Sequence, residues 1–208
     1  ASDVYKRQPL LDAVLASTPS IDTLIVMGDA AGLEPARTGL RIEGWPSGSG
    51  DAPTRRPRRI IDGDVAAILY TSGSTGRPKG VVLSHRNIVA GAESVSQYLS
   101  LTEEDRLLAV LPLSFDYGMN QVTSAFLCGS TAVLMNHLFA KDVITAVDKN
   151  RITGLAAVPP LWIQLAQLSW PAGITEHLRY ITNSGGAMPR DTLEKLRRAL
   201  PRTKPFLM

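Results

Sequence analysis

The sequence predicts an α/β fold with a mostly parallel sheet that is flanked by helices. From residue 60 onward, short apolar runs of strand length alternate with amphipathic helical segments, which is typical of strands joined by crossover helices. Hydrophobic residues make up 44% of the chain and charged residues 20%, so a sizeable core can form. No apolar run approaches the roughly 18 residues that a membrane-spanning helix needs, which predicts no membrane span.

The chain divides by composition into four segments. Residues 1–8, "ASDVYKRQ", are unrelated to the rest of the chain, and residues 3–8 match the translated end of a sequencing-library transposon, so we interpret this segment as foreign. Residues 9–28 predict a helix and then a buried strand, the end of a preceding α/β segment. Residues 29–60 are rich in Pro, Gly and Arg, which predicts a surface connection. Residues 61–208 hold the regular alternation.

Each element of the last segment is predicted by its own pattern. Strand 65–70 leads into a Gly-rich loop and strand 81–84 leads out of it. Helix 85–100 comes next, with Ser84 as its expected N-cap, because a serine oxygen accepts a hydrogen bond from the first helical turn. Further strands are expected at residues 106–113, 131–136, 153–159, 178–185 and 204–208, and further helices at 118–128, 140–150, 160–168 and 189–200.

Charge and cysteine content narrow the function classes. The net charge is +3, but four arginines lie together in "TRRPRR" (residues 54–59), and the rest of the chain carries −1. The basic character is therefore local, which favours a solvated linker over nucleic-acid binding. Cys128 is the single cysteine, so no internal disulfide can form and we expect it to be a small core residue. No secretory signal is visible, and these features together predict a cytoplasmic protein.

The stretch "YTSGSTGRPKG" (Tyr70–Gly80) has the composition of a phosphate-binding loop. Glycines let backbone N–H groups approach an anion, and hydroxyl side chains add further donors. Lys79 adds a positive charge on a long side chain. The loop is not a Walker A motif: counted from Gly73, the second glycine falls on Pro78, and Gly80 comes after the lysine where Ser or Thr would hold Mg²⁺.

Together with three later motifs, this loop resembles the adenylate-forming superfamily of acyl-CoA synthetases, amino-acid adenylation domains and luciferases. The later motifs are "VLPLSFDYG" (Val110–Gly118), "AAVPPL" (Ala156–Leu161) and "NSGGAMP" (Asn183–Pro189). The likeness spans Asp62–Met208 and looks nearest to the AMP-forming acyl-CoA ligases associated with exosortase A gene clusters. It implies that residues 61–208 are part of the large N-terminal domain of an AMP-dependent synthetase, ending before the family's Tyr-Gly-x-Thr-Glu motif.

The resemblance implies a two-step reaction. A carboxylic acid attacks the α-phosphorus of ATP, with Mg²⁺ present, to give acyl-AMP and pyrophosphate; a thiol of CoA or of a carrier protein then takes the acyl group. Lys79 would accompany the departing pyrophosphate, and Gly185, Gly186 and Ala187 would form the adenine wall. The β- and γ-phosphates would be held by Thr71, Ser72, Gly73, Ser74, Thr75 and Gly76.

The resemblance places the acid pocket at Phe115, Asp116, Tyr117 and Gly118. Asp116 has two interpretations: it binds the ammonium group of an amino-acid substrate, or it caps the helix expected to start near Gly118. Three functions are compatible with the motifs: an acyl-CoA synthetase, an amino-acid adenylation domain of a peptide synthetase, or a nucleotide-binding fragment without catalysis. These 208 residues alone are expected to be inactive.

Other candidate residues have a structural interpretation beside the functional one. Trp162 is expected in the core, with the wall of the acyl pocket as the alternative. His85 is expected to pack or cap rather than to approach a phosphate. His137 and His177 have no neighbours at metal-ligand spacing, so no zinc site is expected.

Overall fold

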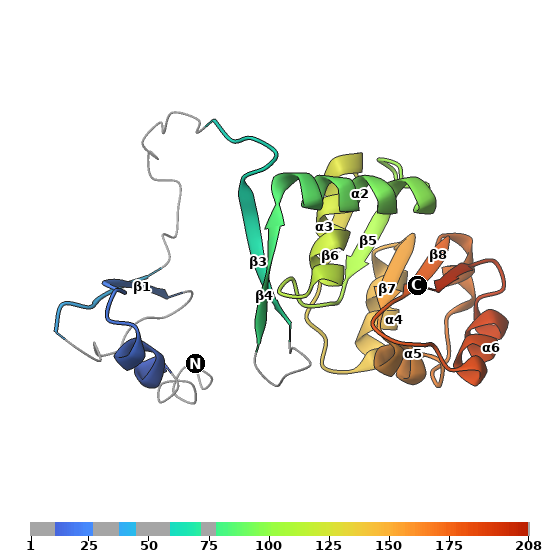
Figure 1. Ribbon diagram of the computed structural model, residues 1–208. Coiled ribbons are helices and arrows are strands. Elements are labelled where there is room, and N and C mark those ends of the chain that lie inside the picture. The colour runs from blue at the N-terminus through green and yellow to red at the C-terminus, as the bar shows by residue number, and fades with distance from the viewer. Residues whose placement is uncertain (1–10, 27–37, 45–58, 72–77, 208) are drawn as a thin grey trace. The chain divides into compact units, whose positions relative to one another are not determined.

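The computed structural model describes residues 11–26, 38–44, 59–71 and 78–207. The chain forms two compact units, residues 1–58 and 59–208 (Figure 1). The described part of the first unit has a helix at residues 11–17 and two parallel strands, β1 (Thr23–Val26) and β2 (Arg41–Gly44). Two predictions were wrong here: β2 lies inside the segment expected to be a connection, and β1 is not buried, since Ile25 is 53% exposed.

The second unit begins with an antiparallel hairpin, β3 (Val65–Thr71) and β4 (Lys79–Ser84). It is a two-stranded sheet of its own. The segment predicted to bind phosphate therefore joins two strands of a hairpin and does not follow a strand of the parallel sheet. Ser84 caps the next helix as predicted: its Oγ accepts a hydrogen bond from the backbone N–H of Asn87 at 3.2 Å.

A five-stranded parallel sheet forms the body of the second unit, in the order β6-β5-β7-β8-β9. This confirms the predicted fold class. The strands are β5 (Arg106–Ala109), β6 (Thr131–Leu134), β7 (Gly154–Ala157), β8 (Tyr180–Asn183) and β9 (Lys204–Leu207). The helices are α2 (His85–Leu99), α3 (Asp116–Cys128), α4 (Ala140–Lys149), α5 (Pro159–Leu165), the 3-10 helix η1 (Ala172–Glu176) and α6 (Arg190–Ala199).

Helices cover both faces of this sheet. Successive strand residues point to opposite sides, so apolar side chains on each side need a helix layer to bury them. On one face, Leu108, Leu155 and Ile181 join the main core with α4, α5 and α6. On the other face, Leu107 and Tyr180 pack with residues of α2 and α3 in a smaller cluster. Figure 1 shows α2 and α3 together, apart from α4, α5 and α6.

Several boundaries differ from the predictions. Helix α3 begins at Asp116, two residues before the expected start, and β5 ends at Ala109 rather than at residue 113. Cys128 is only half-buried at the end of α3, so it is not the core residue that we expected. None of the described helices has the length and apolar composition needed to cross a lipid bilayer.

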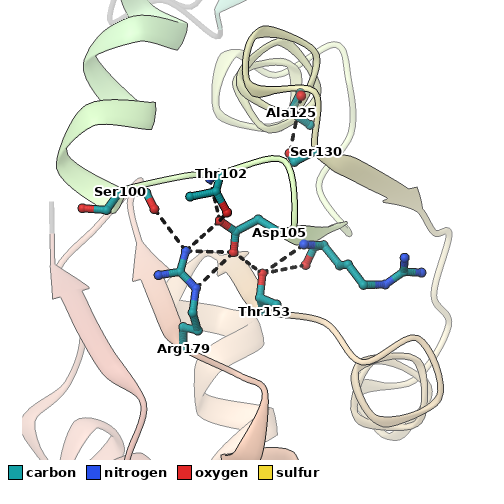
Figure 2. Close-up of polar contacts among 8 residues, drawn as sticks. Ser100, Thr102, Asp105, Ala125, Ser130, Thr153 and Arg179 are labelled. Atoms are coloured by element: carbon teal, nitrogen blue, oxygen red, sulfur yellow. Dashed lines mark hydrogen bonds and ion pairs between the residues drawn. The ribbon is translucent and has the colours of Figure 1, made fainter.

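A buried carboxylate ties the starts of three strands together (Figure 2). Asp105, Thr153 and Arg179 each directly precede a strand: β5, β7 and β8. Asp105 is 2% exposed, and its two oxygens accept hydrogen bonds from Arg179 Nη2 at 2.8 and 2.7 Å. The Thr153 hydroxyl donates to it at 2.5 Å, and the Thr102 N–H at 2.9 Å. Both oxygens of this carboxylate thus face donors, which fixes the strand starts laterally.

The network lowers the pKa of Asp105. Burial alone would raise this pKa, but the hydrogen bonds from Thr153, Arg179 and Thr102 and the positive charge of Arg179 outweigh it. Since the folded-state pKa lies below the unfolded value of about 3.9, the carboxylate stabilises the fold above that value. This contribution is lost as the pH falls through the lower, folded-state pKa.

We expect Asp105→Asn to lower the free energy of unfolding at pH 7 by about 2–3 kcal/mol, because the charge that pairs with Arg179 is removed while Arg179 can still reach water. Urea unfolding measures this, with Glu103→Gln on the same loop as an exposed control that changes stability by less than about 0.5 kcal/mol. The difference between wild type and Asp105→Asn should shrink below about pH 4. Equal losses in the two variants would show that the network does not hold the strands.

Candidate active site

The predicted phosphate residues at the ends of the hairpin lie opposite each other. Thr71 is the last residue of β3 and Lys79 the first of β4, and they are register partners. Both are exposed, and the Thr71 hydroxyl lies 3.5 Å from the carbonyl oxygen of Lys79. The predicted residues Ser72, Gly73, Ser74, Thr75 and Gly76 fall outside the described residues.

The predicted adenine wall is a tight turn that leaves β8. Gly185 has a φ of +78°, which a side chain would strain. Asn183 Nδ2 donates to the carbonyl oxygen of Gly186 at 2.8 Å and so closes the turn. A Cβ at Gly186 would meet Pro159 Cγ at 3.3 Å. The motifs "AAVPPL" and "NSGGAMP", which the sequence separates, therefore pack against each other.

Trp162 ties together the strands that lead into these two segments, on the face of the sheet that α4, α5 and α6 cover. It is fully buried, and its indole N–H lies 3.1 Å from the carbonyl oxygens of both Ala157 and Thr182. These oxygens belong to β7 and β8, just before the two motifs leave the sheet. Trp162 is thus a core residue, as expected, and positions the carboxyl ends of two strands.

The predicted acid-pocket residues lie at the start of α3. Phe115 is the N-cap residue and Asp116 the first helical residue. Asp116 is exposed, and its Oδ1 accepts from the Tyr117 N–H at 2.8 Å. It is therefore a first-turn residue and not the N-cap that one of our interpretations required. At Gly118 a Cβ would overlap the carbonyl oxygen of Pro112, so only glycine allows this close approach.

A hydrogen bond between the hydroxyls of Tyr117 and Thr182 joins the start of α3 to β8. The two residues are 65 positions apart in the sequence. Burial raises the pKa of Tyr117, with the hydrogen bond from Thr182 opposing it to a smaller extent. The Tyr117 hydroxyl therefore stays protonated at neutral pH and can keep this bond.

Two neighbouring spaces lie on the α2/α3 side of the sheet. The outer cleft, between α2, the start of α3 and Ser184, has a volume of about 350 Å³. The inner cavity, between α2, α3 and the sheet, is much smaller, about 30 Å³, which is room for a group of the size of a hydroxyl or a water. Tyr117 and Asn120 line both. The size and the partly apolar lining of the outer cleft suit a small organic ligand.

The structure brings together only part of the predicted site. Asp116 and Tyr117 line the outer cleft, and so does Ser184, which directly precedes Gly185. Lys79, Thr71, Phe115, Gly118 and the glycine turn itself are not among the described residues that line it. Sequence reasoning missed Asn120, Thr182 and Ser184; the period of α3 and the alternation along β8 were the signals that could have found them.

The described residues do not offer a metal centre. No group of three or more His, Cys, Asp or Glu side chains within this part of the chain could hold an ion. His177 uses Nδ1 for a 2.8 Å hydrogen bond with the carbonyl oxygen of Ile152. His85, the first residue of α2, donates its backbone N–H to the carbonyl oxygen of Asp64.

Comparison with known proteins shows one consistent family. The AMP-binding enzyme family matches residues 4–207, a range that includes part of the segment interpreted as foreign. A 2-succinylbenzoate–CoA ligase of Bacillus velezensis is 35% identical over 135 residues, 65% of this chain and 27% of the ligase. An L-proline–[L-prolyl-carrier protein] ligase of Streptomyces coelicolor is 32% identical over 197 residues, 90% of this chain and 36% of that ligase.

Solved structures resemble the chain in the same way. O-succinylbenzoate coenzyme A synthetase from Bacillus subtilis, in complex with AMP, gives a TM-score of 0.61 at 31% identity, over 67% of this chain and 29% of that one. VinN in complex with L-aspartate gives 0.70 at 25% identity, over 94% of this chain and 51% of that one. The chain spans between about a quarter and a half of the length of these proteins.

Proposed function

Because the chain belongs to the AMP-binding enzyme family, we propose that the whole protein activates a carboxylic acid with ATP and passes the acyl group to a thiol. The acid's oxygen bonds to the α-phosphorus, the bond to the bridging oxygen breaks, and pyrophosphate leaves. The thiol sulfur then bonds to the acyl carbon, and AMP leaves. The observation that carries the proposal is the outer cleft, where Asp116 and Tyr117 from α3 meet Ser184 at the glycine turn.

The proposal gives the chain's residues roles of binding and positioning. Phosphoryl transfer needs aligned reactants and neutralised charge more than a protein nucleophile. The hydroxyls and N–H groups of residues 71–76 hold the β- and γ-phosphates, and Lys79 follows the charge that moves onto pyrophosphate. The turn of Gly185, Gly186 and Ala187 packs against adenine, since its backbone lets a flat ring approach closely.

The described residues of this chain contribute little to the binding of Mg²⁺. This ion is usually held by one or two carboxylates together with substrate phosphates and water, and it would neutralise phosphate charge. The described residues offer no carboxylate cluster for it, so no step is assigned to a metal ligand of this chain. A structure of O-succinylbenzoate coenzyme A synthetase contains ATP and magnesium ion, which supports both as ligands of the proposed reaction.

CoA is the acceptor that we favour, because the 2-succinylbenzoate relative is a CoA ligase; a carrier-protein thiol is the alternative that the prolyl relative supports. The proposal extends to the acyl-CoA ligases associated with exosortase A gene clusters, which the motif strings resemble. The proposed setting is the cytoplasm, where a thiol acceptor stays reduced.

An amino-acid adenylating enzyme is the second candidate function. Asp116 favours it, because this carboxylate lines the outer cleft with no ion-pair partner among the described residues. An ammonium group of the substrate would supply the missing positive charge. VinN, whose structure contains L-aspartate, is a structural neighbour consistent with this function.

Lys79→Ala in the protein encoded by the entire reading frame should lower the rate of acid-dependent ATP–pyrophosphate exchange by about 100-fold, because a charge on the leaving group goes unmatched. Lys141→Ala, an exposed lysine on α4, is the control and should leave the rate unchanged. Exchange by Lys79→Ala at the wild-type rate would refute the role of this lysine.

The role of Asp116 is tested by substrate preference. If it binds an ammonium group, Asp116→Ala lowers kcat/KM for an amino acid relative to its des-amino analogue by roughly 10- to 100-fold, since a charge-assisted hydrogen bond is lost. The same exchange assay with paired acids measures the ratio. A ratio that stays at the wild-type value rules out ammonium recognition and leaves a plain carboxylic acid as the substrate.

A further inference from the structure

A buried hydrogen-bond acceptor lines the inner cavity, and none of the described residues donates to it. Gln121 is 7% exposed, and its Oε1 makes no hydrogen bond within the described part of the chain. Its Nε2 lies 3.4 Å from the carbonyl oxygen of Tyr117, which identifies the amide nitrogen, since the reverse orientation would bring two acceptors together. A buried acceptor left unpaired costs stability, so its presence beside a cavity points to a ligand that supplies the donor.

Most of the other polar side chains that line the inner cavity are hydrogen-bonded to one another. The hydroxyls of Tyr117 and Thr182 bond to each other, and Ser124 Oγ donates to Asn120 Oδ1 at 3.2 Å. Tyr180 also lines the cavity, and its hydroxyl makes no hydrogen bond with the described residues. Burial raises the pKa of Tyr180, so this hydroxyl keeps its proton and remains able to donate.

The rest of the cavity wall limits the chemistry of the ligand. Its other members are mainly apolar, among them Val95, Leu99 and Leu107, and no charged residue is found among the described residues that line it. A charged group would enter without a counter-charge, at a high desolvation cost. A bare hydrocarbon would leave Gln121 Oε1 unpaired. A neutral group that can donate and accept hydrogen bonds meets both conditions, and a hydroxyl is the smallest such group.

We propose that the inner cavity selects carboxylic acids whose apolar body carries a hydroxyl group, with Gln121 Oε1 accepting the hydrogen bond from that hydroxyl. The inference rests on the proposed function, since the acid is the substrate there. The carboxyl end stays in the outer cleft near Ser184, and the hydroxyl end passes Tyr117 into the inner cavity. Gln121 is thus a specificity-determining residue that touches the far end of the substrate.

The test compares two acid pairs: hexanoic acid with its terminal hydroxy derivative, and phenylpropanoic acid with its para-hydroxy derivative. For at least one pair, the wild-type protein of the entire reading frame should show a kcat/KM at least about tenfold higher for the hydroxy form in ATP–pyrophosphate exchange. Gln121→Leu should remove or reverse this preference, because the apolar isostere fits the bare acid. Gln97→Leu, an exposed glutamine on α2, should keep it.

The inference is overturned if the wild type shows equal kcat/KM for both acids of each pair, or if Gln121→Leu keeps the wild-type preference. Either result leaves the proposed activation of acids intact. If no acid supports exchange, the proposed function fails instead. Calorimetric titration of the same acids then tests the inference without the reaction. The inference is supported if the wild type binds a hydroxy form more tightly than the plain acid and Gln121→Leu abolishes this difference. No difference in binding for either pair, or no binding at all, contradicts it.

Thermal unfolding separates this role from a structural one. Without ligand, Gln121→Leu should raise Tm by about 2–4 °C, because an unpaired buried amide is replaced by an apolar side chain. A glutamine that holds α3 in place would instead lower Tm when replaced, and that result would contradict the inference.

Discussion

The buried carboxylate of Asp105 is the constraint on which the rest of the parallel sheet depends. It gathers donors from the residues that precede β7 and β8, and it directly precedes β5 itself (Figure 2). Parallel strands that start together end together, so aligned starts also align the carboxyl ends from which the proposed ligand-binding segments leave. At those ends the indole N–H of Trp162 bridges carbonyl oxygens of β7 and β8. Strands β7 and β8 are thus held at both ends.

The cleft is assembled from segments that this frame brings together. Gly118 lets the start of α3 approach the carbonyl oxygen of Pro112, and the Tyr117 hydroxyl then reaches Thr182 on β8. Ser184, the residue that follows β8, also lines the outer cleft. In the proposed reaction, substrate positioning would come from close backbone approaches and one hydroxyl pair rather than from a charged cluster. Such a site suits a reaction in which alignment supplies most of the rate.

Periodicity predicted the elements of the second unit well, because each has one face against a core and shows it in the sequence. It failed where a tertiary contact decides the structure. β2 has the polar sequence "RIEG" and forms only by pairing with β1. The predicted start of α3 was too late. Gly118 is a poor helix former, and its place inside the helix is understood only from its close approach to Pro112, a contact that the sequence does not reveal. Motif residues at the site could be named, but neither the Tyr117–Thr182 bond nor the unpaired Gln121 oxygen can be derived from local sequence.

A crystal structure of the whole protein with a non-hydrolysable acyl-sulfamoyl adenosine would test the proposed site most directly. We expect adenine against Gly185, Gly186 and Ala187, with the acyl group running through the outer cleft past Tyr117 toward Gln121. An adenosine bound away from the glycine turn, or an acyl group that leaves the space between α2 and α3 empty, would contradict the proposed site.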